Sequence, residues 1–390
     1  MTPLEVVIAG GGVGALETAL ALRALAGDRV RLTLVSPSGR FTYRPLAVLE
    51  PFVHRAPRQL PLSAIAGDVG AALVRDAIAA VDCHRRVVYT DGHRQVHYDA
   101  LVIAVGATVT GELAGVLTVD VAHMDRSLTE VIEGIDGGAL RTLAVVVPWP
   151  TWPLGAYELA LLAREHAVEQ QRELAITIIT AEPRPLAVFG AEVSAEVAKM
   201  LADAAITTIP ATTVQATPGG LATVPSTGPL DFDRIVAFPK LAGPAIKGLP
   251  ADADGFLPTS SSGEVTGAAH VYAAGDATNF PVKYGGVAAG QADVVGASIA
   301  AVAGAPVAPA LFDGVVHGFL IRGQRKRRRY FSVRIRSWGA HNVRVAEPAE
   351  WVPGAKIAAR YLGPYLEERW REDAQSVAGL SSYLDTPEPH

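Results

Sequence analysis

The hydrophobic and polar positions of the chain alternate between the periods of strands and of helices. Residues 6–22, VVIAGGGVGALETALAL, begin as an apolar run, pass through a cluster of glycines and continue with apolar residues at helical spacing. This pattern predicts a strand, a tight turn and a helix. The apolar run Val30–Val35 predicts the next strand.

A second unit of the same kind follows near the middle of the chain. The run Leu143–Val147 predicts a strand, Leu154–His166 a helix and Ala175–Thr180 a returning strand. The segment PLGAYELA, residues 153–160, aligns with GVGALETA, residues 12–19, which indicates a duplicated fold. We therefore expect an α/β fold with two Rossmann-like domains.

The stretches around these units predict shorter elements. Residues 38–62 are polar and interrupted by prolines, so we expect a long loop with one helical turn, whose aromatic side chains face a ligand. Short β-like runs fill residues 71–105, with a hairpin turn at Asp91-Gly92. The later elements that we expect are a helix near residues 191–204, a strand that ends at Gly275-Asp276 and a helix over Val287–Ala301.

The C-terminal portion, residues 310–390, has a different pattern of apolar and charged residues. Val315–Ile321 and Tyr330–Ile335 predict paired strands around a turn rich in arginine and lysine. Lys356–Trp370 predicts an amphipathic helix, and we expect Pro364 to kink it. The predicted domains are a discontinuous first domain over residues 1–110 and 235–308, a second over 111–234 and a smaller C-terminal α+β domain over 309–390.

Composition narrows the class of protein. The chain has 390 residues, 49% of them hydrophobic, which is enough to bury a large core, and its net charge of −5 argues against nucleic acid as the main partner. No charged segment precedes an apolar one at the N-terminus and no uninterrupted apolar run is long enough to span a bilayer. We therefore expect a cytoplasmic protein and leave peripheral membrane attachment open. The single Cys83 excludes an internal disulfide or a two-thiol redox centre, and we expect no metal site.

The glycines of the first turn point to phosphate binding. Gly10 permits a tight turn, Gly12 has no Cβ to block a pyrophosphate, and Ala15 lets the helix pack close to the strand. The phosphates would meet the N-terminus of the helix, where free N–H groups and the helix dipole favour negative charge. At the end of the second strand, Ser36 stands where an acidic residue usually binds the ribose.

Two further strand ends carry candidate chemistry. LVIAVGA, residues 101–107, leads into a glycine turn where small residues let a cofactor pass close to the backbone. VYAAGDAT, residues 271–278, places Asp276 at the carboxyl edge of a sheet, where ligands of α/β folds bind. The second unit instead has Pro148–Pro153 in place of a glycine turn, and proline lacks the N–H and the space that a pyrophosphate needs.

The segments GGGVGALE, YDALVIAVGA and VYAAGDAT, in this order, resemble the flavoprotein family with two dinucleotide-binding domains. That family includes type II NADH dehydrogenases, sulfide:quinone oxidoreductases, flavocytochrome c sulfide dehydrogenases and disulfide reductases. The likeness covers about residues 1–305 and implies non-covalent FAD, with Asp276 on the ribityl chain and the Gly286–Ala288 helix start at the flavin edge. The predicted cofactor-binding residues are Gly10, Gly12, Gly14, Ala15, Ser36, Arg44, Val105, Gly106, Gly275, Asp276, Gly286, Val287 and Ala288.

Departures from the family narrow the function. The chain lacks the cysteine pair of the disulfide reductases and of the sulfide-oxidising branches, and it lacks the second glycine loop of the type II NADH dehydrogenases. No well-known branch therefore fits completely. The resemblance places Glu158 and Lys283 near the flavin as candidate catalytic residues, one as a proton relay and one as a stabiliser of reduced flavin. The candidate substrate-pocket residues are Trp149, Trp152 and Tyr284.

The leading hypothesis is an FAD-dependent oxidoreductase that passes two electrons from an unidentified small-molecule donor to a quinone or to another small-molecule or protein acceptor. One alternative keeps NAD(P)H as the donor, bound through the modified turn with Trp149 or Trp152 stacked on it. Another is a flavin-bearing binding or assembly protein without turnover. The basic run Arg325–Arg329 is either a solvated hairpin tip or a contact to an anionic membrane surface or an acidic protein, and a homodimer is left open.

Overall fold

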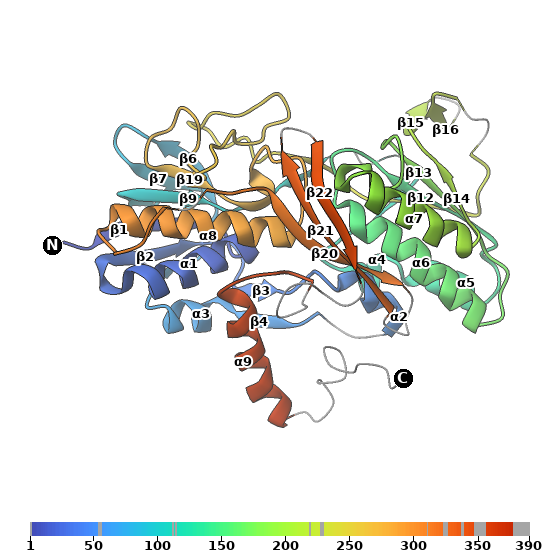
Figure 1. Cartoon of the computed structure of the whole chain (residues 1–390), viewed down its shortest axis with the longest axis horizontal. Coiled ribbons are helices and arrows are strands. Elements are labelled where there is room, and N and C mark those ends of the chain that lie inside the picture. Colours follow the sequence, from blue (N-terminus) through green and yellow to red (C-terminus); the bar gives the residue numbers. More distant parts are fainter. Residues whose placement is uncertain are drawn as a thin grey trace.

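The computed structural model describes residues 2–53, 57–110, 113, 115–217, 220–226, 230–309, 311–322, 327–336, 339–346 and 356–376, and from residue 322 on it describes the side chains of Ile335 and of residues 356–371 only. Figure 1 shows two α/β units side by side, with the C-terminal strands between them. The α/β class that the sequence predicts is confirmed.

The first unit is built on a five-stranded parallel sheet. The strands are β1 (Leu4–Ala9), β2 (Val30–Val35), β5 (Ala72–Val74), β9 (Ala100–Ile103) and β19 (Val271–Ala273), in the order β19-β9-β1-β2-β5. Helices α1 (Val13–Ala26) and α8 (Gly285–Val302) run side by side along this sheet (Figure 1). Gly296 permits their close approach, because a Cβ there would lie 2.8 Å from the Cβ of Ala21.

A small antiparallel sheet covers another face of the first unit. It consists of β6 (Ile78–Asp82), β7 (Val87–Thr90) and β8 (Gln95–His97). The hairpin expected at Asp91-Gly92 is confirmed, because β7 and β8 pair antiparallel across it. Val7 of β1 shares a buried cluster with Val81 and Val88, so the two sheets exclude water between them.

The second unit repeats the architecture of the first. Its parallel strands are β11 (Leu117–Thr118), β12 (Thr142–Val147), β13 (Ala175–Thr180), β14 (Ile206–Ile209) and β17 (Arg234–Ala237), in the order β11-β17-β12-β13-β14. Its helices are α4 (Met124–Ser127), α5 (Thr129–Asp136), α6 (Pro153–Glu169) and α7 (Ala191–Asp203). The predicted strand, helix and strand from Leu143 to Thr180 are confirmed. The expected domain boundary after residue 234 falls inside β17. This whole strand belongs to the second unit, because it pairs with β12.

Short antiparallel pairs complete the second unit and its connections. β10 (Thr108–Thr110) pairs with β18 (Lys240–Ala242) where the chain passes between the two units and returns. β15 (Thr213–Thr217) and β16 (Gly220–Val224) form a hairpin beyond β14. The two crossings therefore lie side by side, and they tie the units together by main-chain hydrogen bonds.

Residues 38–62 hold more regular structure than the expected loop. β3 (Arg40–Thr42) and β4 (Gln59–Pro61) pair antiparallel, with α2 (Glu50–Val53) between them and α3 (Leu62–Asp68) after them. The prediction of a loop was wrong because three-residue strands are too short to show a periodic pattern. Phe41 borders the cavity described below, whereas Phe52 packs in the core beside His166.

The C-terminal part forms an antiparallel sheet and a helix. β20 (Val315–Arg322), β21 (Arg327–Arg336) and β22 (Gly339–Ala346) pair in this order, which confirms the predicted hairpin. Helix α9 (Leu362–Ser376) begins at Leu362 rather than at Lys356. Pro364 therefore falls in the first turn, where no intrahelical N–H donor is needed, and the expected mid-helix kink does not arise.

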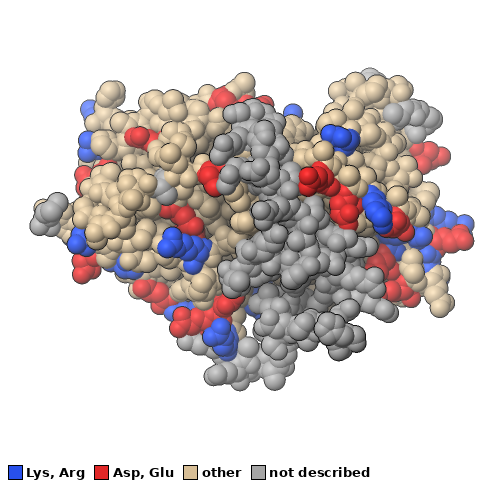
Figure 2. All heavy atoms as spheres, in the orientation of Figure 1, with Lys and Arg blue, Asp and Glu red and all other residues tan. Residues whose placement is uncertain are grey.

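The distribution of surface charge and the apolar helix α8 are relevant to where the protein is located. Figure 2 shows basic and acidic side chains mixed over the visible face, within the described residues. The side chains of Arg325–Arg329 lie outside that described part, so their contact stays a hypothesis. By length and composition α8 could cross a membrane, with a mean hydropathy of 1.3, but 67% of that stretch is buried here, as in the core helix of a globular protein.

Candidate functional site

A cavity of about 640 Å³ lies where the two units meet the C-terminal part. This volume is within the range of small-molecule and cofactor pockets. The first unit contributes the turn between β1 and α1, the end of β2 and the start of α8, and the second unit contributes the start of α6. Lys356 and Ile357 come from the C-terminal part. Carboxyl ends of parallel strands and amino ends of helices thus converge on one space, where α/β folds bind ligands.

The turn between β1 and α1 lets a large group approach the backbone. Gly10 has a φ of +135°, and a Cβ there would lie 2.2 Å from the carbonyl oxygen of Ala104, so the position requires glycine. Gly12 borders the cavity, and a Cβ on it would meet nothing within 4 Å. Gly12 is also the N-cap of α1, and no side chain caps that helix end. This open helix end fits the pyrophosphate of a dinucleotide cofactor.

The end of β2 offers hydroxyl and main-chain groups to the cavity. Ser36 is buried at this strand end and borders the cavity together with Pro37 and Ser38. Arg44 lines the same space. The structure therefore brings Ser36 and Arg44 to the cavity, and a ribose there would meet a hydroxyl where dinucleotide-binding folds usually have a carboxylate.

Asp276, which follows β19, lines the cavity and contacts the second unit. Its Oδ2 accepts a hydrogen bond from Trp152 Nε1 at 2.6 Å. Burial raises the pKa of Asp276, and the hydrogen bond from Trp152 and the charge of Lys283 oppose that rise. A carboxylate in this setting can accept a hydrogen bond from a ligand hydroxyl.

Lys283 is a buried lysine rather than a solvated surface one. It is 3% exposed, and its Nζ donates to the carbonyl oxygen of Thr278 and lies 3.7 Å from the ring centroid of Phe256. Burial lowers the pKa of Lys283 to about 8, and the charges of Asp276 and Asp252 limit the fall. At neutral pH the ammonium is therefore the main form of the Lys283 side chain, and it lies at the edge of the cavity.

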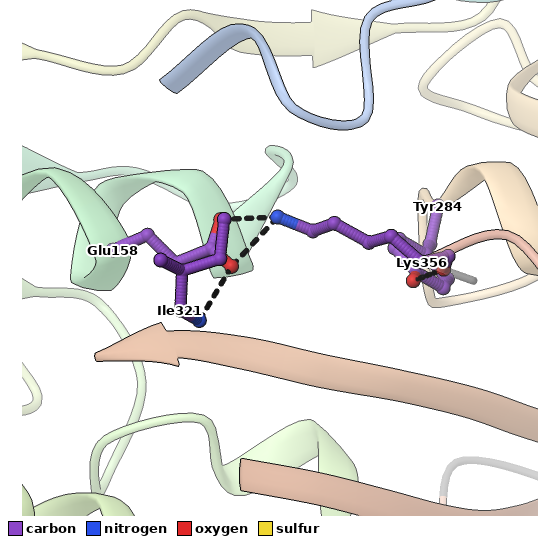
Figure 3. A network of polar contacts seen from close by, with 4 residues as sticks. All are labelled: Glu158, Tyr284, Ile321 and Lys356. Atoms are coloured by element: carbon purple, nitrogen blue, oxygen red, sulfur yellow. Dashed lines mark hydrogen bonds and ion pairs between the residues drawn. The ribbon is translucent and has the colours of Figure 1, made fainter. Parts of the chain in front are cut away.

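Glu158 is the centre of a buried network in the cavity wall (Figure 3). Both of its carboxylate oxygens accept hydrogen bonds from Lys356 Nζ, at 2.6 Å for Oε1, and Oε1 also accepts one from the Ile321 N–H at 3.0 Å. Burial raises the pKa of Glu158, and the Lys356 ammonium opposes the rise. The pair can thus hold a proton at Lys356 Nζ or at the Glu158 carboxyl, out of bulk water.

The main chain of Lys356 is fixed from the opposite side. The Tyr284 hydroxyl, just before α8, donates a hydrogen bond to the carbonyl oxygen of Lys356 (Figure 3). Lys356 therefore touches the first unit through its backbone and the second unit through its side chain. The Lys356 side chain therefore extends from the start of α8 to Glu158 in α6 (Figure 3).

Lys356 was missed as a site residue by sequence reasoning. The sequence signal was weak, because it consists only of apolar neighbours, Ala355 and Ile357–Ala359, around a lysine. Glu158 lies 198 residues earlier in the chain, so no local pattern pairs the two side chains. Lysine is rarely buried unless it is paired, and only the fold reveals the partner.

The predicted site residues divide into two groups. Those that border the cavity are Gly10, Gly12, Ser36, Arg44, Val105, Trp152, Glu158, Asp276, Lys283 and Tyr284. Those that do not border it are Gly14, Ala15, Gly106, Trp149, Gly275, Gly286, Val287 and Ala288. Several of the second group shape the backbone behind the wall: the Gly275 N–H, for example, donates to Gln291 Oε1 at 2.8 Å.

Trp149 does not line the cavity as expected, because the turn that carries it is anchored elsewhere. The Leu241 N–H donates to the carbonyl oxygen of Pro150 at 2.8 Å, and buried Thr151 donates through Oγ1 to Pro239 at 2.8 Å. These bonds hold the turn against β18 and the end of β17. Of the two tryptophans in this turn, Trp152, directly before α6, is the one that lines the cavity.

The acidic residue beyond β13 is also engaged inside the second unit. Glu182 is buried and accepts hydrogen bonds from the Tyr157 hydroxyl at 3.2 Å and from the Val188 N–H at 3.4 Å. Burial raises the pKa of Glu182 to about 7. The Glu182 carboxyl is thus engaged inside the second unit, where a second nucleotide would need an acidic acceptor for its ribose. Within the described residues, no group of three or more His, Cys, Asp or Glu side chains could hold a metal ion.

The sequence matches a family of known proteins over most of its length. Residues 4–294 match the family model described as pyridine nucleotide-disulphide oxidoreductase. A search of curated proteins found no match.

Solved structures extend the likeness to nearly the whole chain. The sulfide:quinone oxidoreductase of Aquifex aeolicus is similar with a TM-score of 0.74 and 18% identity, over 96% of this chain and 92% of that one. A ferredoxin reductase of Rhodopseudomonas palustris gives 0.65 and 18%, over 84% and 81%. Putidaredoxin reductase, in its covalent complex with putidaredoxin, gives 0.63 and 16%, over 85% and 81%. At these identities the structures share the fold.

Proposed function

Because the chain belongs to the pyridine nucleotide-disulphide oxidoreductase family, we propose that it is an FAD-dependent oxidoreductase that passes two electrons from a donor to a quinone or a small protein carrier. One observation carries the proposal: a single cavity joins the open Gly12 helix end, the Asp276 carboxylate and the buried groups Lys283, Glu158 and Lys356. Bound FAD would supply the two-electron chemistry there.

The chain's own residues divide the work between binding and proton handling. The β1–α1 turn holds a pyrophosphate through N–H groups, and Asp276 accepts a hydrogen bond from a ribityl hydroxyl. With FAD bound, Lys283 would supply a positive charge in the cavity that favours the negative charge of reduced flavin. The Glu158–Lys356 pair gives or takes a proton at Lys356 Nζ as the acceptor is reduced. Burial of the pair keeps bulk water from exchanging that proton freely.

The acceptor is proposed from the cavity wall and from similar structures. Apolar side chains line part of the cavity: Val48, Val121, Met124, Phe189 and Phe238. Such a wall favours an apolar ring system over a charged molecule. The names of the similar structures mention a quinone and putidaredoxin as redox partners. With a quinone as acceptor, peripheral contact with a membrane becomes the simplest location for this protein.

The donor is proposed to be a molecule other than NAD(P)H. The turn Pro148–Pro153 is anchored inside the second unit, Pro153 removes an N–H at the first position of α6, and Glu182 is engaged by Tyr157. A pyridine nucleotide would therefore find neither its phosphate donors nor its ribose acceptor in the second unit.

Anaerobic stopped-flow absorbance of the FAD-loaded protein tests the function. NADH, NADPH and sulfide are mixed in separately, and the flavin band is followed before a soluble quinone or a ferredoxin-type carrier is added. We expect no saturable bleaching by pyridine nucleotides, and we expect chemically reduced protein to be reoxidised by the quinone or carrier. Saturable bleaching by NADH or NADPH would make the protein a pyridine-nucleotide reductase. If the reduced protein transfers electrons to neither acceptor, the oxidoreductase proposal fails in favour of a binding or assembly role.

Replacement of Lys283 by methionine is expected to lower the midpoint potential of the bound flavin by roughly 30–60 mV, about 1.4–2.8 kcal/mol for two electrons. The Lys283 ammonium stabilises reduced flavin, and its proton is lost as the pH rises through about 8. The difference between parent and K283M should therefore be largest at neutral pH and shrink above pH 8. A dye-coupled redox titration measures it without a physiological donor.

The exposed Lys240 on β18 provides a matched control for this experiment, since K240M removes the same charge from a residue that does not border the cavity. K240M should keep the parental potential at every pH. Equal potentials for K283M and K240M would remove Lys283 from the mechanism.

A further inference from the structure

One hydrogen bond links the second unit directly to the carboxylate of Asp276 in the first unit. Trp152 Nε1 donates to Asp276 Oδ2 at 2.6 Å, and these two residues lie 124 positions apart. The indole N–H is a donor only, so the bond favours the ionised form of Asp276. The charge of Lys283 and the Tyr284 N–H also favour the ionised form of this carboxyl.

The position of Trp152 is set by the core of the second unit. Thr151 and Pro150 on one side are hydrogen-bonded to Pro239 and Leu241, and on the other side α6 begins at Pro153. Gly155, in the first turn of α6, lies so close to Phe238 that a Cβ would come within 3.0 Å of the ring. The backbone on both sides of Trp152 is therefore fixed, and the indole presents its N–H to the cavity from a rigid support.

A rigid donor on one oxygen fixes the plane of the carboxylate. Free rotation of the Asp276 side chain would have to be lost when a ligand hydroxyl binds, and the Trp152 hydrogen bond removes that freedom beforehand. It also stabilises the charge that makes the carboxylate a strong acceptor in a buried place. Phenylalanine at this position would keep the ring and lose both effects.

We propose that Trp152 is a positioning residue: it orients the Asp276 carboxyl for a ribityl-type hydroxyl of the cofactor and favours its ionised form. The turn that in a duplicated unit would hold a second nucleotide thus serves the first cofactor site. The inference rests on the proposed function, in that the ligand of Asp276 is FAD.

The test is the FAD dissociation constant of reconstituted apoprotein as a function of pH, measured by the fluorescence of free FAD. The affinity of the parent, measured at each pH from about 8 down to about 6, is the reference, because Lys283 beside Asp276 also titrates near pH 8. In W152F the pKa of Asp276 rises further, so the affinity should fall with decreasing pH, by roughly tenfold at the acid end. W149F, which changes a tryptophan of the same turn outside the cavity, should follow the parent.

A second variant separates positioning from a general structural role. If Trp152 acts through Asp276, then W152F should have no further effect on affinity in a D276N background. A loss in W152F that is the same at every pH, or that persists in D276N, overturns the inference, as does a parental profile in W152F. If the parent itself fails to bind FAD, the proposed function fails. If the parent binds FAD and W152F binds it in the same way, only the inference about Trp152 fails. Thermal melting of the apoproteins shows whether each variant is folded.

Discussion

Replacement of Gly12 by valine is expected to abolish FAD binding while leaving the apoprotein as stable as the parent. A Cβ on Gly12 would meet no protein atom within 4 Å, and its φ of −98° and ψ of −167° are extended values that valine adopts readily. The added methyl groups would instead occupy the space in front of the uncapped N-terminus of α1. We expect the FAD affinity to fall by about a hundredfold or more, corresponding to roughly 3 kcal/mol of lost contacts.

Calorimetric titration of FAD and thermal melting of the apoprotein measure the two halves of this prediction. Gly67 in α3 gives a matched control, because a Cβ there also meets nothing within 4 Å and the residue does not border the cavity. G67A should change neither FAD binding nor melting by much. If G12V binds FAD like the parent, the phosphate site is not at this turn. If G12V fails to fold while G67A folds, the open space at Gly12 has a structural purpose instead.

Replacement of Lys356 by methionine is expected to cost both stability and turnover. Its ammonium is the charge partner of Glu158, which is 0% exposed. Removal of one partner from a buried ion pair leaves an uncompensated charge and costs about 3–5 kcal/mol. If the pair moves the proton of the acceptor, the rate of flavin reoxidation by a quinone should fall by about a hundredfold as well.

The pH dependence of this destabilisation follows from Glu158. Burial raises the folded-state pKa of Glu158 above its unfolded value, and loss of the Lys356 charge raises it further. A raised carboxyl pKa means stability that is present at low pH and lost as the pH rises through the folded-state pKa. Urea unfolding should therefore show K356M closest to the parent at acidic pH and furthest from it at alkaline pH.

The double variant E158Q/K356M separates stability from catalysis. It removes both charges, while the glutamine oxygen can still accept the Ile321 N–H. We expect it to recover much of the stability that K356M loses and none of the reoxidation rate. Recovery of both would show that the pair is structural only, and parental stability in K356M would contradict the buried ion pair itself.

The duplication visible in the sequence has a structural consequence that the sequence does not show. In the alignment of residues 12–19 with 153–160, Glu17 corresponds to Glu158. Both carboxylates are buried and both bind the C-terminal segment: Glu17 accepts the Tyr361 and Leu362 N–H groups at 2.8 and 2.5 Å, and Glu158 binds Lys356. Equivalent residues of the two units thus anchor successive parts of one segment, and that segment supplies Lys356 to the cavity.

Elements governed by local rules could be predicted from the sequence. Apolar runs and helical spacing placed β1, α1, β2, β12, α6 and β13 within a few residues, because strand and helix periods are properties of neighbouring positions. Gly10 and Gly12 could be assigned to a turn because backbone freedom depends on the residue itself. The same rules failed for the three-residue strands β3 and β4, and for Pro364, whose effect depends on where its helix begins.

By itself, the sequence determined the α/β class, the strand–turn–helix units and the glycine turn, since each depends on contacts within a few residues. Only the tertiary structure decided which side chains share the cavity. It joined Glu158 to Lys356 and Trp152 to Asp276, and it kept Trp149 outside. The physical reason is that a buried charged or polar group pairs with a partner that is near in space. The separation of the two residues along the chain does not indicate which residue that partner is.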